Sequence, residues 1–468
     1  MSRRNLFWIL GIVAVSLLGL AVSYSAPTRE KDRDYELVRL LVDVLQEVRH
    51  KYVVDVDPER ERKLVEDMIN GGLERLDPHS HYINPREYKQ FDRQSEGKFG
   101  GVGIQVGFDR QKGNMLTVIS PMAGSPAYEA GVFAGDVILK IDGKGTDTIR
   151  MSEAVDMIQG EPGSTVVLTL RREGEPKPLE ISIKRDIIKV PSVLGDQRKA
   201  SNEREWDYFI DPKNRIGYIR LVNFSKTTTQ ELQAVLQTLE KDDVQGLVLD
   251  LRNNPGGLLR AAVEISDLFL NEGVIVSTKG RNHKDEVYRA KMDGTMLQRN
   301  GQPVPMVVLI NHYSASASEI LSAALQDHKR AVVIGERSYG KGSVQNVILM
   351  ENDTSALKLT TASYWRPSGK NIHRFPDKKD FEAAKIDPDE WGVKPSPGFD
   401  IAQTEQDRVD YMVYRSERDI VRKTAKPAAK DKDGQPKKPY EDKVLQKALE
   451  YLRKETVRGA AVPAKTDA

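Results

Sequence analysis

Cysteine is missing from all 468 residues of this chain. Its absence excludes disulfides, thiolate metal sites and cysteine nucleophiles. An excess of one charge is missing too, because 71 Lys and Arg nearly balance 69 Asp and Glu, for a net charge of +2. A dedicated nucleic-acid binder should show a strong basic excess, so we predict no nucleic-acid partner. The chain is too long for one ordinary core, and roughly two to four domains are expected.

The N-terminus carries an apolar run from Leu6 to Val22, preceded by Arg3 and Arg4 and followed by small residues. This layout is typical of a secretory signal, and the run is also long enough to remain as a membrane anchor. Both alternatives place the rest of the chain outside the cytoplasm. We therefore predict that residues 1–27 are a signal peptide or membrane anchor, with membrane association possible through this segment. The predicted location is the periplasm or cell envelope.

Helical patterns flank the chain at both ends. Apolar residues recur at helical spacing in segments 35–50, 59–76, 403–423 and 440–456. We predict an N-terminal helical domain over residues 28–96, and C-terminal helices over 401–468 joined by a Lys- and Pro-rich linker at 425–439. These terminal helices are candidates for forming a homodimer.

Residues 97–184 change to short strands with glycine turns. A glycine loop, Gly100 to Ile104, feeds a strand, and a short helix and a further strand follow. This order resembles a PDZ domain. The resemblance implies that backbone N–H groups of the loop bind the terminal carboxylate of a peptide, which adds as a strand to the sheet edge. The residues concerned are Gly101, Val102, Gly103 and Ile104. The alternative is that these glycines only make turns.

Residues 185–400 alternate strand and helix. Continuous apolar strands between helices predict a buried, largely parallel sheet. The expected strands are 215–221, 246–251, 306–310 and 331–335, and the expected helices are 227–240, 258–270 and 318–326.

Ser316 is the first of two residues that suggest hydrolytic chemistry. It directly precedes a good helix former, and the free N–H groups and dipole of a helix N-terminus favour a developing negative charge. The Ala317 N–H is then a natural oxyanion donor. The alternative is a capping box, in which Ser316 and Glu319 satisfy only the helix end.

Lys341 is the second residue, lying beyond the strand at 331–334 and flanked by Gly340 and Gly342. A lysine can take a proton from serine only if burial lowers its pKa towards neutrality. Apolar neighbours such as Val344 offer such an environment, and the alternative is an exposed loop lysine. Together the two segments predict a Ser/Lys hydrolase.

Other chemistries fit less well. The segment from Gly335 to Lys341 copies most of a phosphate-binding P-loop, but Gly342 replaces the Ser or Thr that binds magnesium, and a strand is expected to follow. No Gly-x-Ser-x-Gly elbow occurs, and His312 and His328 have no partnering acid. The histidine pair in 79–81 is too small for a metal site. We predict no metal and no organic cofactor.

The chain resembles the carboxyl-terminal processing proteases, the tail-specific proteases of peptidase family S41. The resemblance spans Leu76-Asp77-Pro78-His79-Ser80, the PDZ segment, Leu249 to Gly257, and the serine and lysine segments. It implies an α/β multidomain fold: a crotonase/ClpP-like ββα protease core with a PDZ domain and N- and C-terminal helical segments. After residue 369 a charged insertion departs from the family pattern, which affects one wall of the substrate cleft.

The resemblance also implies roles for individual residues. They are Ser316 as nucleophile, Lys341 as general base, Gln345 as the residue that orients the lysine amine, and the N–H groups of Ala317 and of Gly257 or Gly256 as oxyanion donors. The function implied is a serine endopeptidase that recognises the C-termini of polypeptide substrates. Two alternatives are a PDZ scaffold with an inactive core and a crotonase-like acyl-thioester enzyme.

Overall fold

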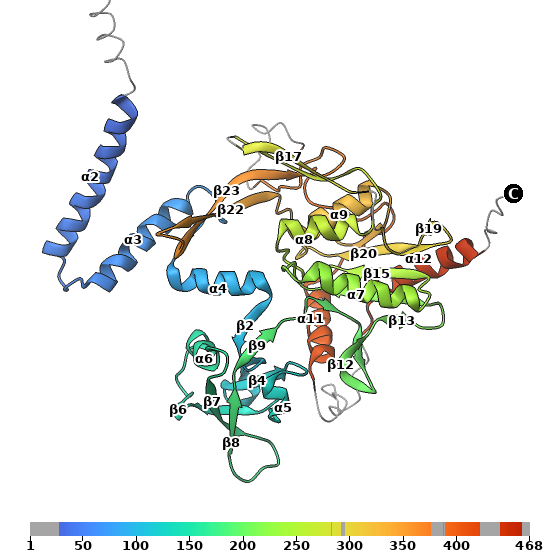
Figure 1. The fold of residues 1–468 in the computed structure, drawn as a ribbon, viewed down its shortest axis with the longest axis horizontal. Coiled ribbons are helices and arrows are strands. Elements are labelled where there is room, and N and C mark those ends of the chain that lie inside the picture. The colour runs from blue at the N-terminus through green and yellow to red at the C-terminus, as the bar shows by residue number, and fades with distance from the viewer. Residues whose placement is uncertain are drawn as a thin grey trace, which may run out of the picture. The chain divides into compact units, whose positions relative to one another are not determined.

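The computed structural model describes residues 28–281, 283–291, 295–375, 387, 389–421 and 440–460 (Figure 1). The chain divides into two compact units, Met1–Tyr82 and Ile83–Ala468. The expected signal or anchor, 1–27, and the expected linker, 425–439, lie outside the described residues. Membrane association and location therefore stay predictions.

The first unit contains the helices α2 (Thr28–Lys51) and α3 (Pro58–Leu73), both expected from apolar spacing. Asp57 caps α3 by accepting the Arg60 N–H at 2.8 Å. Pro58 occupies the first helical position, where a missing N–H has no consequence. Within the described residues, no helix is both long and apolar enough to cross a membrane.

The expected PDZ region is an antiparallel sheet with two short helices. Its elements are β3 (Ile104–Asp109), η1 (Arg110–Lys112), β4 (Met115–Pro121), α5 (Pro126–Glu129), β5 (Val137–Ile141), β6 (Lys144–Gly145), α6 (Met151–Ile158), β7 (Thr165–Arg171) and β8 (Leu179–Lys184). The strand order is β3-β4-β5-β7-β8, with β6 on β5. Leu116, Ile138 and Leu168 belong to a core of its own. Among the described strands β3 pairs only with β4, so its outer edge is open to an added strand.

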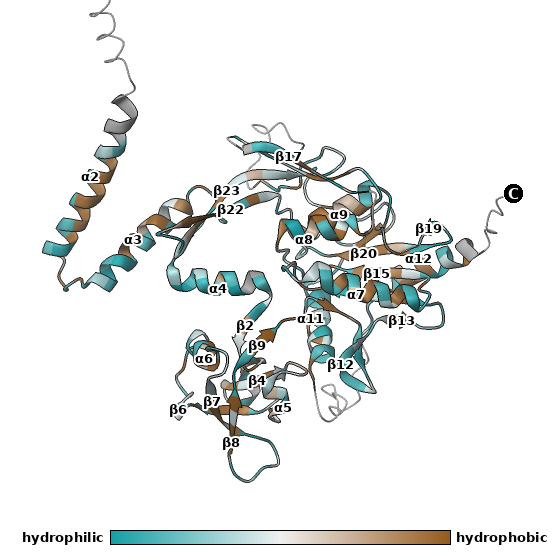
Figure 2. Cartoon of the chain, in the orientation of Figure 1, coloured by the Kyte–Doolittle hydropathy of each residue, from teal (hydrophilic) through white to brown (hydrophobic). Residues whose placement is uncertain are grey.

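The PDZ region is framed by β2 (Lys98–Gly101) and β9 (Asp186–Lys189), which pair antiparallel. Before them lies α4 (Pro85–Glu96), which the sequence analysis did not predict as a helix. Figure 2 shows that α4 is largely hydrophilic; its apolar face is limited to Tyr88 and Phe91, which lie about one turn apart.

The central sheet is the buried, largely parallel one expected. Its elements are β10 (Val193–Leu194), β13 (Phe209–Asp211), β14 (Ile216–Leu221), α7 (Thr228–Lys241), β15 (Gly246–Asp250), α8 (Leu259–Asp267), β20 (Met306–Ile310), α9 (Ala317–Asp327), β21 (Val332–Gly335), α11 (Glu405–Asp419) and α12 (Lys443–Ala460). The strand order is β10-β14-β15-β20-β21, with β13 on β14. Strands β14, β15, β20 and β21 run parallel.

Helices cover both faces of this sheet. Leu236 of α7, Ile265 of α8 and Ile320 of α9 join the core on one face. On the other face, Ala448 and Leu452 of α12 pack against strand residues that include Val307 and Ile334, a separate cluster. Such burial on both faces explains why the strands are continuously apolar, as Figure 2 shows for β15 and β20.

A second sheet lies beside the core and carries the segment after Lys341. Its strands include β16 (Val274–Gly280), β17 (His283–Arg289), β22 (Ser343–Met350) and β23 (Ser355–Trp365), of which β22 and β23 form a hairpin. The remaining elements are β1 (His81–Ile83), β11 (Gln197–Lys199), β12 (Asn202–Asp207), β18 (Gln298–Arg299) and β19 (Gln302–Pro303).

Candidate active site

Ser316 occupies the turn that joins β20 to α9, immediately before the helix. Its backbone has φ 55° and ψ −113°, a conformation that non-glycine residues rarely adopt. Holding a residue there costs about 1–3 kcal/mol and is characteristic of functional sites. No Gly-x-Ser-x-Gly motif announces this turn, so its strain is a finding of the structure.

The Gly256–Gly257 turn lies directly against Ser316. A Cβ on Gly256 would stand 2.8 Å from Ser316 Cβ and 2.9 Å from the Ala317 nitrogen, so only glycine fits. The Gly256 N–H is used internally, since it donates to Asn254 Oδ1 at 2.9 Å. In the described part of the chain, the N–H groups of Gly257 and Ala317 donate no hydrogen bond. Gly257 is therefore the glycine whose donor is available.

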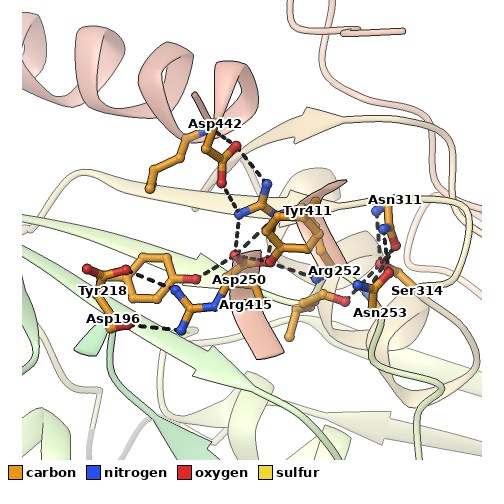
Figure 3. A network of polar contacts seen from close by, with 12 residues as sticks. Asp196, Tyr218, Asp250, Arg252, Asn253, Asn311, Ser314, Tyr411, Arg415 and Asp442 are labelled. Atoms are coloured by element: carbon orange, nitrogen blue, oxygen red, sulfur yellow. Dashed lines mark hydrogen bonds and ion pairs between the residues drawn. The ribbon is translucent and has the colours of Figure 1, made fainter. Parts of the chain in front are cut away.

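The loop of these glycines is fixed by buried amides. Asn254 is fully buried; its Nδ2 donates to Leu221 O at 2.8 Å, and its carbonyl accepts the Ser318 hydroxyl at 3.0 Å. Asn253 and Asn311 exchange two hydrogen bonds of 3.0 and 2.7 Å, which tie the loop to the serine segment (Figure 3). Rigid support of this kind keeps donors in place for a reacting oxygen.

Lys341 is half-buried in the loop that joins β21 to β22. Its flanking glycines are required by close packing: a Cβ on Gly342 would stand 2.2 Å from the His373 nitrogen, and one on Gly340 would stand 2.7 Å from Arg374 Cβ. The described start of the charged insertion thus packs directly on the lysine loop. As expected, a strand and not a helix follows Lys341, which removes the P-loop alternative.

Glu319 joins the serine turn to the lysine loop. Its Oε2 accepts both the Ser316 N–H and the Lys341 N–H, each at 2.8 Å. Its Oε1 accepts the Gly340 N–H at 2.7 Å and the Ser338 hydroxyl at 2.5 Å. From the sequence, this residue is expected only as part of a capping box. The structure shows that one carboxylate also holds the backbone of a segment some twenty residues further along the chain.

Glu319 has no exposed surface. Burial raises its pKa to about 7, and the hydrogen bonds from Ser338, Gly340, Ser316 and Lys341 oppose that rise. The ionised carboxylate, which can accept all four bonds, therefore predominates only above neutral pH.

We expect this carboxyl to lower stability as the pH rises from about 4.5 to about 7. In that window the folded protein still holds a proton that unfolded glutamate has released, so the folded state binds more protons. The free energy of unfolding, measured with urea, should fall by roughly 2–3 kcal/mol more in the wild type than in Glu319→Gln when the pH is raised from about 5 to about 8. A stability difference that does not change with pH would contradict this assignment.

Gln345 lies where the β22–β23 pairing slips. Val344 pairs with Ala362 but Gln345 pairs with Thr360, an irregularity of the kind that redirects side chains near active sites. The Gln345 amide donates to Ser343 Oγ at 2.8 Å and to Thr360 Oγ1 at 3.2 Å. Its expected role toward the lysine amine stays a prediction.

The expected carboxylate-binding loop has its carbonyls turned toward α5. Val102 O accepts the Ala127 N–H at 2.9 Å, and Gly103 O accepts the Ser125 hydroxyl at 3.0 Å. The Val102 and Gly103 N–H groups donate no hydrogen bond within the described residues. Gly103 has φ 74°, and a Cβ there would stand 2.3 Å from Ser125 Cβ. The loop thus presents unused donors, as carboxylate binding requires.

The histidines near the serine show no triad. His312 Nδ1 lies 3.6 Å from Glu336 Oε2, and Glu336 is engaged by Arg408. His328 Nε2 lies 2.7 Å from Val274 O. Within the described residues, no group of three or more His, Asp or Glu is placed to hold a metal ion.

Comparison with known proteins points to one family. The chain matches peptidase family S41 over residues 215–389 and a PDZ domain over residues 117–172. A carboxy-terminal-processing protease of Bartonella bacilliformis is 38% identical over 469 residues, covering 99% of each chain. A carboxyl-terminal-processing protease of Synechocystis is 36% identical over 335 residues, 70% of this chain and 72% of the relative.

Among solved structures, a photosystem II D1 C-terminal processing protease is 28% identical and covers 76% of this chain and 86% of its own, with a TM-score of 0.39. The assignment rests on the sequence relatives, because the Bartonella bacilliformis protease matches over 99% of both chains and the Synechocystis protease over more than two thirds of both. This similarity shows that the chain belongs to the carboxy-terminal-processing proteases, PDZ-containing serine peptidases of family S41.

Proposed function

We propose that the protein is an endopeptidase that selects substrates by their C-terminus and cleaves them with Ser316 as nucleophile and Lys341 as general base. The observation that carries this proposal is the Glu319 carboxylate, which holds the backbones of both residues at 2.8 Å. It explains how a strained serine and a loop lysine from different elements are kept in register. The peptidase family replaces the acyl-thioester alternative.

The proposed reaction is acyl transfer in two halves. The Ser316 hydroxyl attacks the scissile carbonyl carbon while the neutral Lys341 amine takes its proton. The N–H groups of Ala317 and Gly257 stabilise the tetrahedral oxyanion. When the peptide bond breaks, the leaving amine takes the proton from Lys341, and the acyl group remains on serine. Water then attacks the ester, Lys341 takes its proton, and the acid product leaves as serine recovers its hydrogen. The route uses no metal or organic cofactor.

Substrate selection is proposed to lie in the PDZ region. The Val102 and Gly103 N–H groups would receive the terminal carboxylate, and the preceding residues would add as a strand along β3. Backbone pairing supplies affinity that depends little on the sequence of the peptide. The main requirement for binding is then the negative charge of the free C-terminus.

A fluorogenic peptide with an apolar C-terminus tests the function when compared with its C-terminally amidated form. We expect the free acid to be cleaved with a lower KM, by about tenfold or more, because a charge-assisted hydrogen bond is lost on amidation. Gly103→Ala should abolish that difference, since its Cβ collides with Ser125. Gly113→Ala is the matched control, because Gly113 also has positive φ but open space around it.

Equal KM values for acid and amide in the wild type would refute recognition of the C-terminus. Absence of any cleavage by the wild type would refute the peptidase proposal itself.

A further inference from the structure

The residue that caps the C-terminal helix α12, Asp442, contacts the protease core. Asp442 directly precedes the helix, and its Oδ1 accepts the Leu445 N–H at 3.0 Å. The same carboxylate receives both terminal nitrogens of Arg252, Nη1 on Oδ1 and Nη2 on Oδ2, each at 2.9 Å (Figure 3). A cap residue has thus been used to make a two-pronged ion pair with a residue 190 positions away.

Arg252 is enclosed. Its side chain is 1% exposed, against 0% for Asp250 and 8% for Asp442. Asp250 accepts its Nε and Nη2, and the Tyr411 ring lies 4.1 Å from the guanidinium carbon. Burial lowers the pKa of Arg252, but the charges of Asp250 and Asp442 outweigh burial and raise it well above its usual range. The guanidinium therefore stays charged.

The two carboxylates divide the donors of Arg252 between them. Asp250 takes Nε and one Nη2 bond, whereas Nη1 donates to Asp442 alone among the described residues. Without Asp442, a buried N–H of a charged group would lack its acceptor, which is the costly case for a buried ion pair. We expect the Arg252 side chain to shift in order to satisfy this N–H.

Movement of Arg252 would reach the catalytic loop. Arg252 is two residues before Asn254, whose Oδ1 holds the Gly256 N–H and whose carbonyl holds Ser318. The Arg252 N–H is itself held by Asp250 Oδ1 at 2.9 Å. The Arg252 side chain and the backbone from 252 to 257 therefore connect α12 to the Gly257 N–H.

We propose that Asp442 is a positioning residue for the oxyanion loop: through Arg252 it fixes the turn that presents the Gly257 N–H. The C-terminal helix is then a working part of the catalytic centre and not only a cover for the sheet. This inference rests on the proposed peptidase function and on Gly257 as oxyanion donor.

Asp442→Asn in the full-length protein tests the inference. Asparagine caps helices as well as aspartate does, so α12 keeps its start. One of the two oxygens that accept from Arg252 becomes an amide nitrogen, and the negative charge that pairs with the guanidinium is lost. We expect kcat for the fluorogenic peptide to fall about tenfold or more with KM unchanged, as for other residues that support reacting groups from behind. A peptide aldehyde forms an oxyanion on the serine, so its inhibition constant should rise by the same factor.

Arg453→Gln is the matched control. Arg453 lies on the same helix and pairs with the buried carboxylate of Asp211 at 2.7 Å, away from the catalytic loop. Its loss should reduce the melting temperature but leave kcat and aldehyde inhibition unchanged. Asp442→Ser, which also keeps a capping oxygen, provides a second variant should the asparagine protein fail to fold.

The inference is overturned if the wild type cleaves, Ser316→Ala does not, and a folded Asp442 variant has wild-type kcat and aldehyde inhibition. It is also overturned if Arg453→Gln lowers kcat as much as Asp442→Asn, because docking of the helix would then explain both. If wild type and Ser316→Ala do not differ, the proposed peptidase function fails first.

Discussion

Ser316→Ala and Lys341→Ala are each expected to reduce cleavage of a peptide by roughly 10³- to 10⁶-fold, the range found when one member of a nucleophile–base pair is removed. Alanine at 316 removes the attacking oxygen, and alanine at 341 removes the acceptor of its proton. Lys341→Arg should be as inactive as Lys341→Ala, because a guanidinium cannot give up its proton at neutral pH. The measurement is the steady-state rate with a fluorogenic peptide, beside circular dichroism of each variant.

Lys358→Ala is the matched control for the lysine. Lys358 lies on β23, where it pairs with Val347, and burial lowers its pKa as a catalytic lysine requires. Its partner Val347 lies four residues after Ser343, the start of β22 that adjoins Lys341. Loss of the Lys358 side chain should therefore leave cleavage intact. Loss of activity in Lys358→Ala with full activity in Lys341→Ala would show that the wrong lysine has been assigned.

Glu319→Gln is expected to reduce kcat by about 100-fold with little change in KM. The carboxylate accepts two N–H bonds on Oε2, from Ser316 and Lys341, and an amide nitrogen cannot accept either. Whichever oxygen is replaced, an N–H group would face another N–H group across less than 3 Å. A nitrogen in place of Oε2 would push the Ser316 and Lys341 backbones apart, and one in place of Oε1 would displace Gly340, the residue before the base. The peptide-binding surfaces stay unchanged in both cases.

Glu336→Gln is the comparison for this prediction. Glu336 follows β21 on the same loop, pairs with Arg408 and lies 3.6 Å from His312 Nδ1. It should retain wild-type kcat. Wild-type kcat in Glu319→Gln would remove the argument that a single carboxylate holds the two reacting residues in register.

Elements with strong local patterns were predictable. The apolar strands at 246–250 and 306–310 identify a buried parallel sheet, and helices between them follow from spacing. Strand β16 begins with the apolar run Val274-Ile275-Val276, a local signal that was overlooked. Helix α4 was missed because its sequence is polar apart from Tyr88 and Phe91, and strand β17 because its sequence is mostly charged. Their conformations depend on contacts made elsewhere in the chain.

In the site too, features set by local sequence were predictable and features set by distant contacts were not. A helix beginning after Ser316 follows from local sequence, but the positive φ of Ser316 does not, because no glycine marks the turn. Ser-x-x-Glu has one meaning locally, a cap, and a second meaning only once the chain has folded and brought Lys341 back to Glu319. The Asp442–Arg252 pair spans 190 positions, and no spacing rule connects such residues.

Reaction of the protein with a fluorophosphonate, followed by location of the label by mass spectrometry, tests the assignment of Ser316 and Lys341 most directly. We predict a single label on Ser316, formed far more slowly in Lys341→Ala, because only an activated serine attacks phosphorus rapidly. A label on any other residue, or labelling of Ser316 at the same rate without Lys341, would contradict it.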